Sequence, residues 1–353
     1  MRVLLLSRYA RLGASSRQRF YQYLPFLQLR GIEVTVAPLL GDDYIIGLYG
    51  GQVPIISVLR SYMTRLGVML RVKRFDVVWV EKEMLPWLPG WFEVGLFPGG
   101  ISMVVDYDDA VFHRYDRHQF SWIRTLLGGK IDAVMQRADL VIVGNDYLGN
   151  RARQAGARRV ELLHTVVDVS KYTVAASGPD GPITIGWIGS PSTARYLNHI
   201  SPVLREMVES RGARIVAVGA NTEQLSGLPV QVKSWSEQSE VSDIQQFDIG
   251  IMPLPDEPFE RGKCGYKLIQ YMACGKPVVA SPVGVNSVIV CDGVEGFLAS
   301  AHSQWCAALR NLCDDPSLRR RMGLAGRKRV EAEYSLQVSA PRLEALLRSV
   351  VKS

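Results

Sequence analysis

The sequence contains little cysteine, and its cysteines follow no metal-binding or disulfide pattern. Five are present among 353 residues: Cys264, Cys274, Cys291, Cys306 and Cys313. Their number is odd and no two form a C-x-x-C pair, so the sequence indicates neither a disulfide framework nor a zinc site. This cysteine usage favours a reducing cytoplasm.

Several short catalytic motifs are also missing. The chain has no G-x-S-x-G turn, no H-E-x-x-H pair and no G-x-x-x-x-G-K-[ST] loop. These absences argue against an α/β-hydrolase, a zinc protease and a P-loop enzyme. No basic tract is interleaved with aromatic residues, so nothing in the sequence supports nucleic-acid binding.

No apolar run is long enough for a secretion signal or a membrane span. The apolar run within residues 1–8 is too short for a signal peptide and is typical of a first buried strand. The apolar region over residues 87–105 is interrupted by Pro89, Glu93 and Pro98. We therefore expect a cytoplasmic protein that contacts a membrane at most peripherally, at the inner face.

Positive charge is unevenly distributed in an otherwise ordinary globular composition of 47% hydrophobic and 21% charged residues. The net charge is +7, with a balance of +6 over residues 1–175 and +1 over residues 176–353. Excess cations on one half favour anionic partners or a negatively charged membrane surface. A moderately basic, solvated surface explains the asymmetry equally well.

Apolar strand patterns alternate with helical patterns along the whole chain, which predicts an α/β fold with parallel sheets. The predicted strands of the first half cover residues 3–7, 33–37, 77–80, 103–106, 140–143 and 160–163. Those of the second half cover residues 184–188, 214–218, 230–232, 249–252 and 278–280. Predicted helices include residues 16–31, 239–246 and one that passes through Leu204 and Met207.

A segment rich in glycine, proline and small residues, 175–182, is the best linker candidate. It separates a predicted first domain, residues 1–175, from a second domain, residues 176–335; a final helix in 336–353 is expected to pack back on the first domain. Two doubly wound halves place ligands at the carboxyl ends of their strands, and we expect a cleft between them there.

The segment 259–284 is the most informative part of the chain. A loop containing Gly262 and Gly265 precedes a helical pattern, which ends at Gly275 before a short apolar strand. The start of such a helix attracts anions through its backbone N–H groups, and Lys263 and Lys267 add positive charge beside it. This arrangement predicts a phosphate site.

The order of residues in this segment resembles the nucleotide-sugar signature of family 4 glycosyltransferases, which have the GT-B fold. Four further stretches fit the same family pattern, and the resemblance covers nearly the whole chain, from Arg2 to about Tyr334. These stretches are residues 13–16, 138–145, 165–168 and 247–253.

The resemblance implies two Rossmann-like domains and a retaining transferase that needs no metal cofactor. The implied donor is a nucleoside diphosphate sugar, and the implied acceptor is a saccharide or lipid-linked hydroxyl in bacterial surface polysaccharide or glycolipid synthesis. It also implies a set of donor-binding residues: Gly13, Gly189, Ser190, Ser192, Thr193, Arg195, Gly219, Lys263, Cys264, Gly265, Tyr266, Lys267 and Gln270.

The sequence departs from the family pattern at its acidic pair. Gly262 and Gln270 occupy the two positions at which relatives carry carboxylates. Gln270 keeps an acceptor oxygen for the ribose hydroxyls. Gly262 cannot take the place of the family's first carboxylate, and the nearest carboxylates upstream are Glu257 and Glu260.

A second departure concerns the cations of the diphosphate site. Relatives carry an arginine and a lysine where this chain has Trp187 and Ser192. Ser192 and Thr193 either bind phosphate oxygens or cap a helix. Lys263 either stabilises the leaving phosphate, as the resemblance implies, or is a solvated surface lysine.

A carboxylate cluster, residues 106–116, follows a predicted buried strand of the first half. Many relatives carry a histidine at the position of Asp108, followed by the aspartate that Asp109 matches; here the histidine, His113, lies five residues later. Clustered carboxylates suggest a metal site or acceptor binding, so Asp108, Asp109 and His113 are catalytic candidates. The Asp106-Tyr-Asp108 sequence matches the metal motif of the other main transferase fold, but the surrounding pattern does not, so we expect no metal. Alternatively, Asp109 caps the next helix and Asp116 pairs with a neighbouring arginine.

The aromatic stretch 87–97 and the basic stretch 71–74 either form a peripheral membrane contact or belong to an ordinary buried helix and a solvated surface. The altered signature also leaves open a non-catalytic GT-B protein that binds a nucleotide-sugar in a regulatory role. An epimerase of the same fold is a third alternative.

Overall fold

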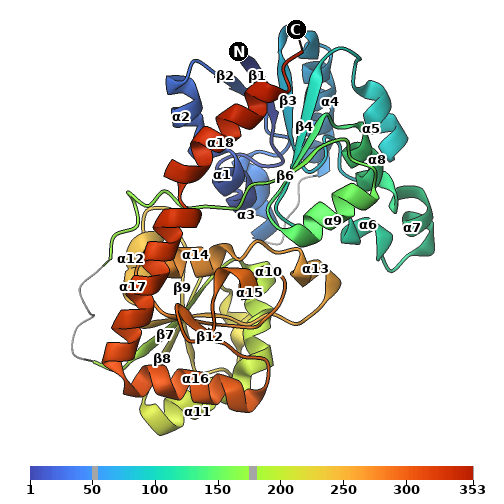
Figure 1. The fold of residues 1–353 in the computed structure, drawn as a ribbon. Coiled ribbons are helices and arrows are strands. Elements are labelled where there is room, and N and C mark those ends of the chain that lie inside the picture. The colour runs from blue at the N-terminus through green and yellow to red at the C-terminus, as the bar shows by residue number, and fades with distance from the viewer. Residues whose placement is uncertain (50–54, 175–180, 353) are drawn as a thin grey trace. The chain divides into compact units, whose positions relative to one another are not determined.

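The computed structural model describes residues 1–49, 55–174 and 181–352 (Figure 1). The chain divides into two compact units. The first contains residues 1–165, the short segment Gly262–Cys264 and residues 336–353; the second contains residues 166–261 and 265–335. Most of the predicted linker, residues 175–180, lies outside the described residues.

The first unit is built on a six-stranded parallel sheet with the order β2-β1-β3-β4-β5-β6. Its strands are β1 (Arg2–Leu6), β2 (Glu33–Val36), β3 (Val77–Glu81), β4 (Ser102–Tyr107), β5 (Leu140–Val143) and β6 (Val160–Leu162). Its helices are α1 (Ala14–Arg19), η1 (Tyr21–Tyr23), α2 (Leu24–Leu29), α3 (Asp42–Tyr49), α4 (Ile55–Met69), η2 (Val72–Arg74), α5 (Gly90–Leu96), α6 (His113–Asp116), α7 (Ser121–Leu127), α8 (Lys130–Arg137), α9 (Asp146–Gln154) and α18 (Leu336–Ser349).

The second unit also has a six-stranded parallel sheet, with the order β12-β11-β10-β7-β8-β9. Its strands are β7 (Thr184–Ile188), β8 (Arg214–Val218), β9 (Val230–Lys233), β10 (Ile249–Met252), β11 (Val278–Ala280) and β12 (Gly296–Leu298). Its helices are α10 (Pro191–Ala194), η3 (Arg195–Ile200), α11 (Ser201–Arg211), η4 (Thr222–Leu225), α12 (Glu240–Gln245), α13 (Pro258–Arg261), α14 (Tyr266–Ala273), α15 (Asn286–Ile289), α16 (His302–Asp314) and α17 (Pro316–Glu333).

Helices cover both faces of each sheet, so the strands are apolar on both sides. In β7, Ile185 and Trp187 belong to one core cluster with residues of α11 and α16, whereas Ile188 belongs to another with residues of α14. Alternate residues of a strand point to opposite faces. This double burial explains why the strand patterns were continuous apolar runs.

Both sheets reverse their winding direction between two neighbouring strands. The strand order changes direction between β1 and β3 in the first unit and between β7 and β10 in the second. In doubly wound sheets, ligands bind outside the carboxyl ends of the strands at this switch point. The predicted α/β class and its two Rossmann-like halves are confirmed.

One predicted helix was wrong. Residues 16–31 do not form a continuous helix, because α1 ends at Arg19, the turn η1 follows and α2 begins at Leu24. Phe20 leaves the helical conformation, with φ −130°. Pro25 has no N–H to continue the hydrogen-bond ladder, so it is accommodated only in the first turn of a new helix.

Among the described residues, no helix combines the length and the apolar character needed to cross a bilayer.

Candidate functional site

Polar side chains gather at the carboxyl ends of β3 and β4 in the first unit. Lys82 directly follows β3, and Asp108 and Asp109 directly follow β4. The ammonium group of Lys82 lies 2.7 Å from an Asp108 carboxylate oxygen and 3.6 Å from one of Asp109. Ser15 lies in α1, the helix that follows β1, and its hydroxyl donates a hydrogen bond to Asp108 at 2.6 Å. The structure therefore brings two predicted catalytic carboxylates together with a lysine at the switch point.

Lys82 adopts a left-handed backbone conformation, with φ +64°. A non-glycine residue in this region is strained, and such strain is concentrated at functional sites. Burial alone would lower the pKa of Lys82, but Asp108 and Asp109 outweigh burial and raise it. Burial conversely opposes ionisation of Asp108, and Lys82 reverses that effect and lowers its pKa. The pair is charged, and Asp109 keeps the more exposed carboxylate, 30% against 13% for Asp108.

A second ion pair lies below this cluster. The Arg19 guanidinium donates to Asp106 at 2.8 Å and to the carbonyl of Leu163 at 2.6 Å, and both charged side chains are buried. Burial raises the pKa of Asp106 to about 6, although Arg19 opposes the shift. Arg19 Nη2, Asp106 Oδ2 and Glu81 Oε1 are buried without a hydrogen-bond partner in the described structure. Buried polar atoms without a hydrogen-bond partner are uncommon in folded proteins.

His113 belongs to a different network. Its ring nitrogens contact Asp116 Oδ1 and the Tyr147 hydroxyl, each at 2.8 Å. Asp116 also pairs with Arg151 at 3.3 Å. Helix α6 has Phe112 as its N-cap, so Asp109 does not cap it. The structure thus separates His113 from the contacts that Asp108 and Asp109 make.

The segment Gly262–Cys264 is held by the loop after β5. The Asn145 amide donates to the carbonyls of Gly262 (2.9 Å) and Lys263 (3.1 Å), and the Cys264 thiol donates to the carbonyl of Asp108 (3.1 Å). The Lys263 side chain is half-buried. Its backbone is therefore fixed within the first unit.

This packing explains why Gly262 carries no side chain. A Cβ atom there would lie 2.5 Å from the Cβ of Ala110 and 2.8 Å from its backbone nitrogen. Real Cβ atoms do not approach neighbours so closely, so the family's first carboxylate cannot be accommodated here without rearrangement.

Two further residues of the implied donor set have structural roles in the first unit. Burial raises the pKa of the Cys264 thiol to about 12, so the thiol is protonated. Gly13 is the N-cap of α1, and a side chain there would overlap that of Tyr9. The glycine lets the loop after β1 pass close to that ring.

In the second unit, a hydroxyl-rich turn follows β7 at the switch point. Ser190 is the N-cap of α10, and its hydroxyl lies 2.9 Å from that of Ser192 and 3.4 Å from that of Thr193. Gly219, with φ +81°, directly follows β8. It lies so close to Gly189 that a side chain at position 219 would overlap the Gly189 carbonyl. The two glycines bring both loops together.

Lys267 supplies a cation at this turn. Its ammonium lies 5.2 Å from the centroid of the Trp187 ring, and its side chain borders Gly189. Trp187 stands where relatives have an arginine. The indole face attracts a cation, so the lysine of α14 brings positive charge close to that position.

The start of α14 has the predicted form. Gly265 precedes it with φ +64°, a conformation that favours glycine, and Tyr266 and Lys267 form its first turn. Gln270, farther along, is buried and donates to the Tyr172 hydroxyl at 3.0 Å, which in turn donates to Glu240 at 2.7 Å. The structure thus commits the Gln270 amide to an internal network.

Glu260, the expected substitute carboxylate, is buried on α13. One of its oxygens accepts a hydrogen bond from Tyr196, and the other has no partner among the described residues. The Arg195 guanidinium lies 5.3 Å from the Tyr196 ring centroid. Glu257, the other expected substitute, is exposed.

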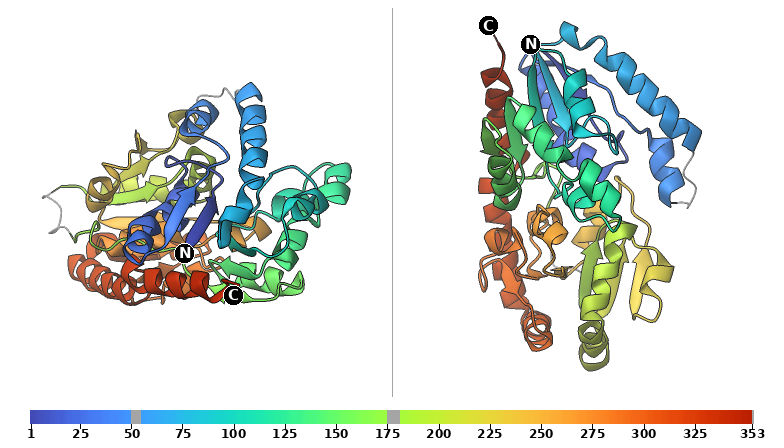
Figure 2. Two further views of the ribbon diagram at one scale, coloured as in Figure 1. Left: turned by 90° about the horizontal axis from the view of Figure 1, so that it is seen from above. Right: turned by 90° about the vertical axis from the view of Figure 1, so that its right-hand side faces the viewer.

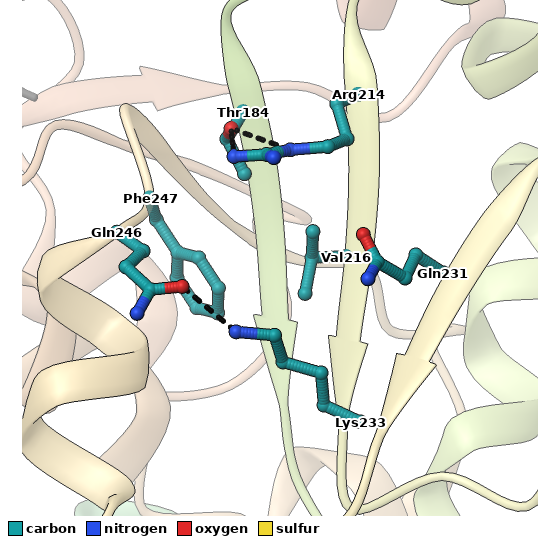
Figure 3. Close-up of a pocket in the computed structure, with 7 residues that line it drawn as sticks. All are labelled: Thr184, Arg214, Val216, Gln231, Lys233, Gln246 and Phe247. Atoms are coloured by element: carbon teal, nitrogen blue, oxygen red, sulfur yellow. Dashed lines mark hydrogen bonds between the residues drawn. The ribbon is translucent and has the colours of Figure 1, made fainter. Parts of the chain in front are cut away.

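A small pocket in the second unit lies along the strands β7, β8 and β9 (Figure 3). Its lining residues are Thr184, Arg214, Val216, Gln231, Lys233, Gln246 and Phe247. Lys233 donates to Gln246 at 2.7 Å, and Arg214 donates to the Thr184 hydroxyl at 2.8 Å. The pocket extends from Thr184 at the start of β7 to Lys233 at the end of β9, and no ligand is assigned to it.

One group of three potential metal donors is found in the described residues: Glu206, His302 and Cys306. The Cys306 thiol donates to Glu206 at 3.2 Å, and the carboxylate also pairs with Arg310. Burial and Glu206 raise the pKa of Cys306 to about 11. Because Arg310 already neutralises the Glu206 carboxylate, no metal site is assigned.

Comparison with known proteins identifies this second unit. Residues 183–315 match the family model described as glycosyl transferases group 1. This stretch includes the turn after β7, Glu260 and the whole of α14. Residues 183–315 are therefore similar to glycosyl transferases group 1.

Curated relatives match parts of the chain at modest identity. The chain is 28% identical over 206 residues to the D-inositol 3-phosphate glycosyltransferase of Mycobacterium marinum, a match that covers 51% of this chain and 43% of that protein. With the same enzyme of Mycolicibacterium smegmatis the identity is 24% over 244 residues, or 61% of this chain and 53% of that protein. The chain thus spans about half the length of these relatives.

Solved structures share the fold over the full chain. Sucrose-phosphate synthase of Thermosynechococcus elongatus superposes with a TM-score of 0.72 at 14% identity, covering 99% of this chain and 98% of that one. Anabaena HepE, solved in complex with UDP-glucose, gives 0.72 at 14% identity, covering 99% and 100%. These neighbours are GT-B glycosyltransferases, and the predicted GT-B fold is confirmed.

Sequence reasoning missed Lys82, Arg19 and Tyr172. Lys82 carried a usable signal, because Glu81-Lys82-Glu83 directly follows an apolar strand as Asp108 does. Arg19 and Tyr172 carried none, since their partners Asp106 and Gln270 are 87 and 98 residues away in sequence.

Proposed function

We propose that the protein transfers a sugar from a nucleoside diphosphate donor to a hydroxyl of a saccharide or lipid-linked acceptor. The observation that carries this proposal is the group 1 match over residues 183–315, which contains the glycine and lysine loop flanking α14. The full-length likeness to glycosyltransferase folds supports it.

The donor diphosphate is assigned to the second unit and its signature loop. The positive end of α14 favours an anion, and Lys267 and the hydroxyls of Ser190, Ser192 and Thr193 stand at the neighbouring turn. Arg195 is a further cation of the second unit, and Lys263 remains a candidate from the sequence pattern alone. Their work is electrostatic stabilisation of the leaving diphosphate.

The acceptor is assigned to the first unit. Asp109 is the more exposed carboxylate, so it is the one suited to accept a hydrogen bond from the acceptor hydroxyl. Asp108 is held by Lys82 and Ser15 and positions the cluster. His113 would act through Tyr147 and Asp116 rather than on the reacting atoms.

The proposed reaction retains the anomeric configuration. The bond from the anomeric carbon to the phosphate oxygen breaks through an oxocarbenium-like state, and the acceptor oxygen bonds on the same face. The acceptor proton passes to the leaving phosphate. No metal is proposed, because Asp106 and Asp108 are each already paired with a cation.

A substrate panel tests the proposal. Purified protein is incubated with UDP-, GDP- and ADP-sugars, UDP-glucose included, and thermal stabilisation is measured. Nucleoside diphosphate release is then followed with saccharide, inositol phosphate and lipid-linked acceptors. Stabilisation by a donor with acceptor-dependent release is expected, and stabilisation by no donor would refute the proposal.

A non-catalytic nucleotide-sugar binder is the second candidate. The observation that favours it is Gly262, whose packing against Ala110 excludes the family's first carboxylate. Donor stabilisation without turnover on any acceptor distinguishes it. For either function we propose a cytoplasmic place in bacterial surface polysaccharide or glycolipid synthesis.

A further inference from the structure

Helix α4 is anchored to the first unit by one face. Tyr62 donates from its hydroxyl to the carbonyl of Pro86 at 2.7 Å. The buried Arg65 donates to the carbonyls of Ser7 (2.7 Å) and Ala37 (3.0 Å). Neighbouring apolar residues of this face, Leu66 and Met69, pack into the core of the unit. These contacts fix the orientation of the helix.

A different face of α4 is apolar and exposed. Ile56, Leu59 and Met63 follow one another at spacings of three and four residues, so they form one stripe. Their exposed fractions are 84%, 63% and 68%, and Leu70, just beyond the helix, is 87% exposed. The right-hand view of Figure 2 shows the helix along the outer margin of the first unit. The fold makes no use of this stripe.

The charges around the stripe have one sign. Residues 55–74 contain no aspartate or glutamate and five cations, of which Arg60, Arg71, Lys73 and Arg74 are exposed. The acidic contact found on this helix among the described residues is at its first turn, where Ser57 Oγ lies 3.5 Å from Asp43. The apolar stripe has positive charges and no negative charges beside it in residues 55–74. It is therefore complementary to a surface with an apolar interior and an anionic outer layer.

We propose that α4 and the basic residues after it, Ile55–Arg74, form a docking surface for an anionic lipid bilayer. The exposed side chains would enter the boundary between headgroups and acyl chains, and the cations would contact the headgroups. A second copy of the chain fits less well, because it would bring two sets of cations face to face.

Vesicle sedimentation tests the proposal with the full chain. The protein is mixed with vesicles of phosphatidylcholine, with and without phosphatidylglycerol. We expect binding that requires phosphatidylglycerol and weakens as salt is added. Combined Ile56→Ser, Leu59→Ser and Met63→Ser should reduce partitioning by about tenfold or more, and Arg60→Glu with Arg71→Glu by a similar factor.

Matched controls come from α17 of the second unit. Leu324 is an exposed leucine, and Arg320 and Arg321 are exposed cations. Leu324→Ser and the double variant Arg320→Glu/Arg321→Glu should bind vesicles as the unaltered chain does. Thermal unfolding of every variant checks that the fold is retained, which is expected because the changed side chains are exposed.

Absence of binding by the unaltered chain, or equal binding by the α4 variants, would overturn the proposal. So would α4 variants that change the molar mass in light scattering while vesicle binding stays constant, since that identifies a second copy as the occupant. No donor or acceptor is used. Failure of the proposed transfer reaction therefore leaves this result unaffected.

Discussion

At the residue scale, the arginine that the family resemblance leads us to expect in β7 is absent. Trp187 occupies that position, and the Lys267 ammonium lies over its ring. Lys267 is therefore a candidate for the predicted diphosphate site. The position of its ammonium group depends on the Trp187 ring.

Lys267→Met is therefore expected to weaken donor binding by about 10-fold to 100-fold, because a charge-assisted hydrogen bond is lost. The measurement is the concentration of UDP-sugar that gives half-maximal thermal stabilisation. Lys328→Met, at an exposed position on α17, is the control. Equal donor affinity in both variants would remove Lys267 from the site.

Asp106 gives a prediction on pH. Its folded-state pKa, raised by burial to about 6, lies above that of an unfolded aspartate. The stabilisation from the neutral acid is thus complete below about pH 4 and is lost as the pH rises through about 6. Asp106→Asn stays neutral, so its free energy of unfolding relative to the unaltered chain should rise by about 2–3 kcal/mol between pH 4 and 7.

For Asp108→Asn, we expect the opposite dependence of stability on pH. The pKa of Asp108 is lowered in the fold, so its contribution is present at neutral pH and is lost as the pH falls. Relative to the unaltered chain, this variant should lose stability as the pH rises. Denaturant unfolding over the pH range measures both, and parallel profiles for all three proteins would contradict the assignments.

Gly262 permits a test of the missing carboxylate. Gly262→Glu should destabilise the protein by about 1–3 kcal/mol, because its Cβ would lie 2.5 Å from that of Ala110. Ala110→Gly in the same chain should recover part of the loss. Denaturant titration gives both values, and an undiminished midpoint for Gly262→Glu would show that the segment adapts freely.

At the scale of elements, the switch-point strand of the second unit depends on one close contact. Gly186 in the middle of β7 faces the ring of Phe247, and a side chain at this glycine would overlap that ring. The strand carries the Gly189–Thr193 turn, so any displacement of β7 moves the candidate donor site.

Gly186→Ala is expected to lower stability by about 1–3 kcal/mol through overpacking. Phe247→Leu combined with it should be less destabilised than the sum of the two single changes, because the smaller side chain makes room. The double-mutant cycle is measured by denaturant unfolding. Additive losses would show that the glycine is required for another reason.

At the scale of the whole molecule, each unit is assembled from distant parts of the chain. The first unit is completed by α18, which packs against α2 and η1; Figure 1 shows α18 beside α2. Arg30 donates to Glu344 at 2.9 Å, and Leu343 and Leu347 are fully buried. Stability of the first unit therefore depends on α18, which is far in sequence from the rest of that unit.

Leu343→Ala should accordingly cost about 2–5 kcal/mol. Val338→Ala, at a half-exposed position of the same helix, should change stability by no more than about 0.5 kcal/mol. Thermal unfolding in the presence of a donor adds a second readout, since a donor bound to the second unit should still stabilise the Leu343→Ala variant. Loss of donor stabilisation would contradict the assignment of the donor to that unit.

Local patterns predicted the strands well. Residues 184–188, 214–218 and 249–252 are strands with the predicted bounds, because each is an apolar run bounded by turn residues. The prediction of one helix over residues 16–31 was wrong for an equally local reason, because Pro25 has no N–H for the helical hydrogen-bond ladder. The partners of Lys82 and Gln270 were beyond prediction, since a pairing between residues far apart in sequence depends on which strands become neighbours.

The sequence by itself determined the fold class, the strands other than β12 and the signature loop before α14, because these follow from periodicity and from residues close together in the chain. Only the tertiary structure decided that Lys82 holds Asp108 and Asp109, that Lys267 lies over Trp187, and that Gln270 is committed to Tyr172. The physical reason is that charge pairing and burial depend on distances across the sheet edge, and these are set when the strands assemble.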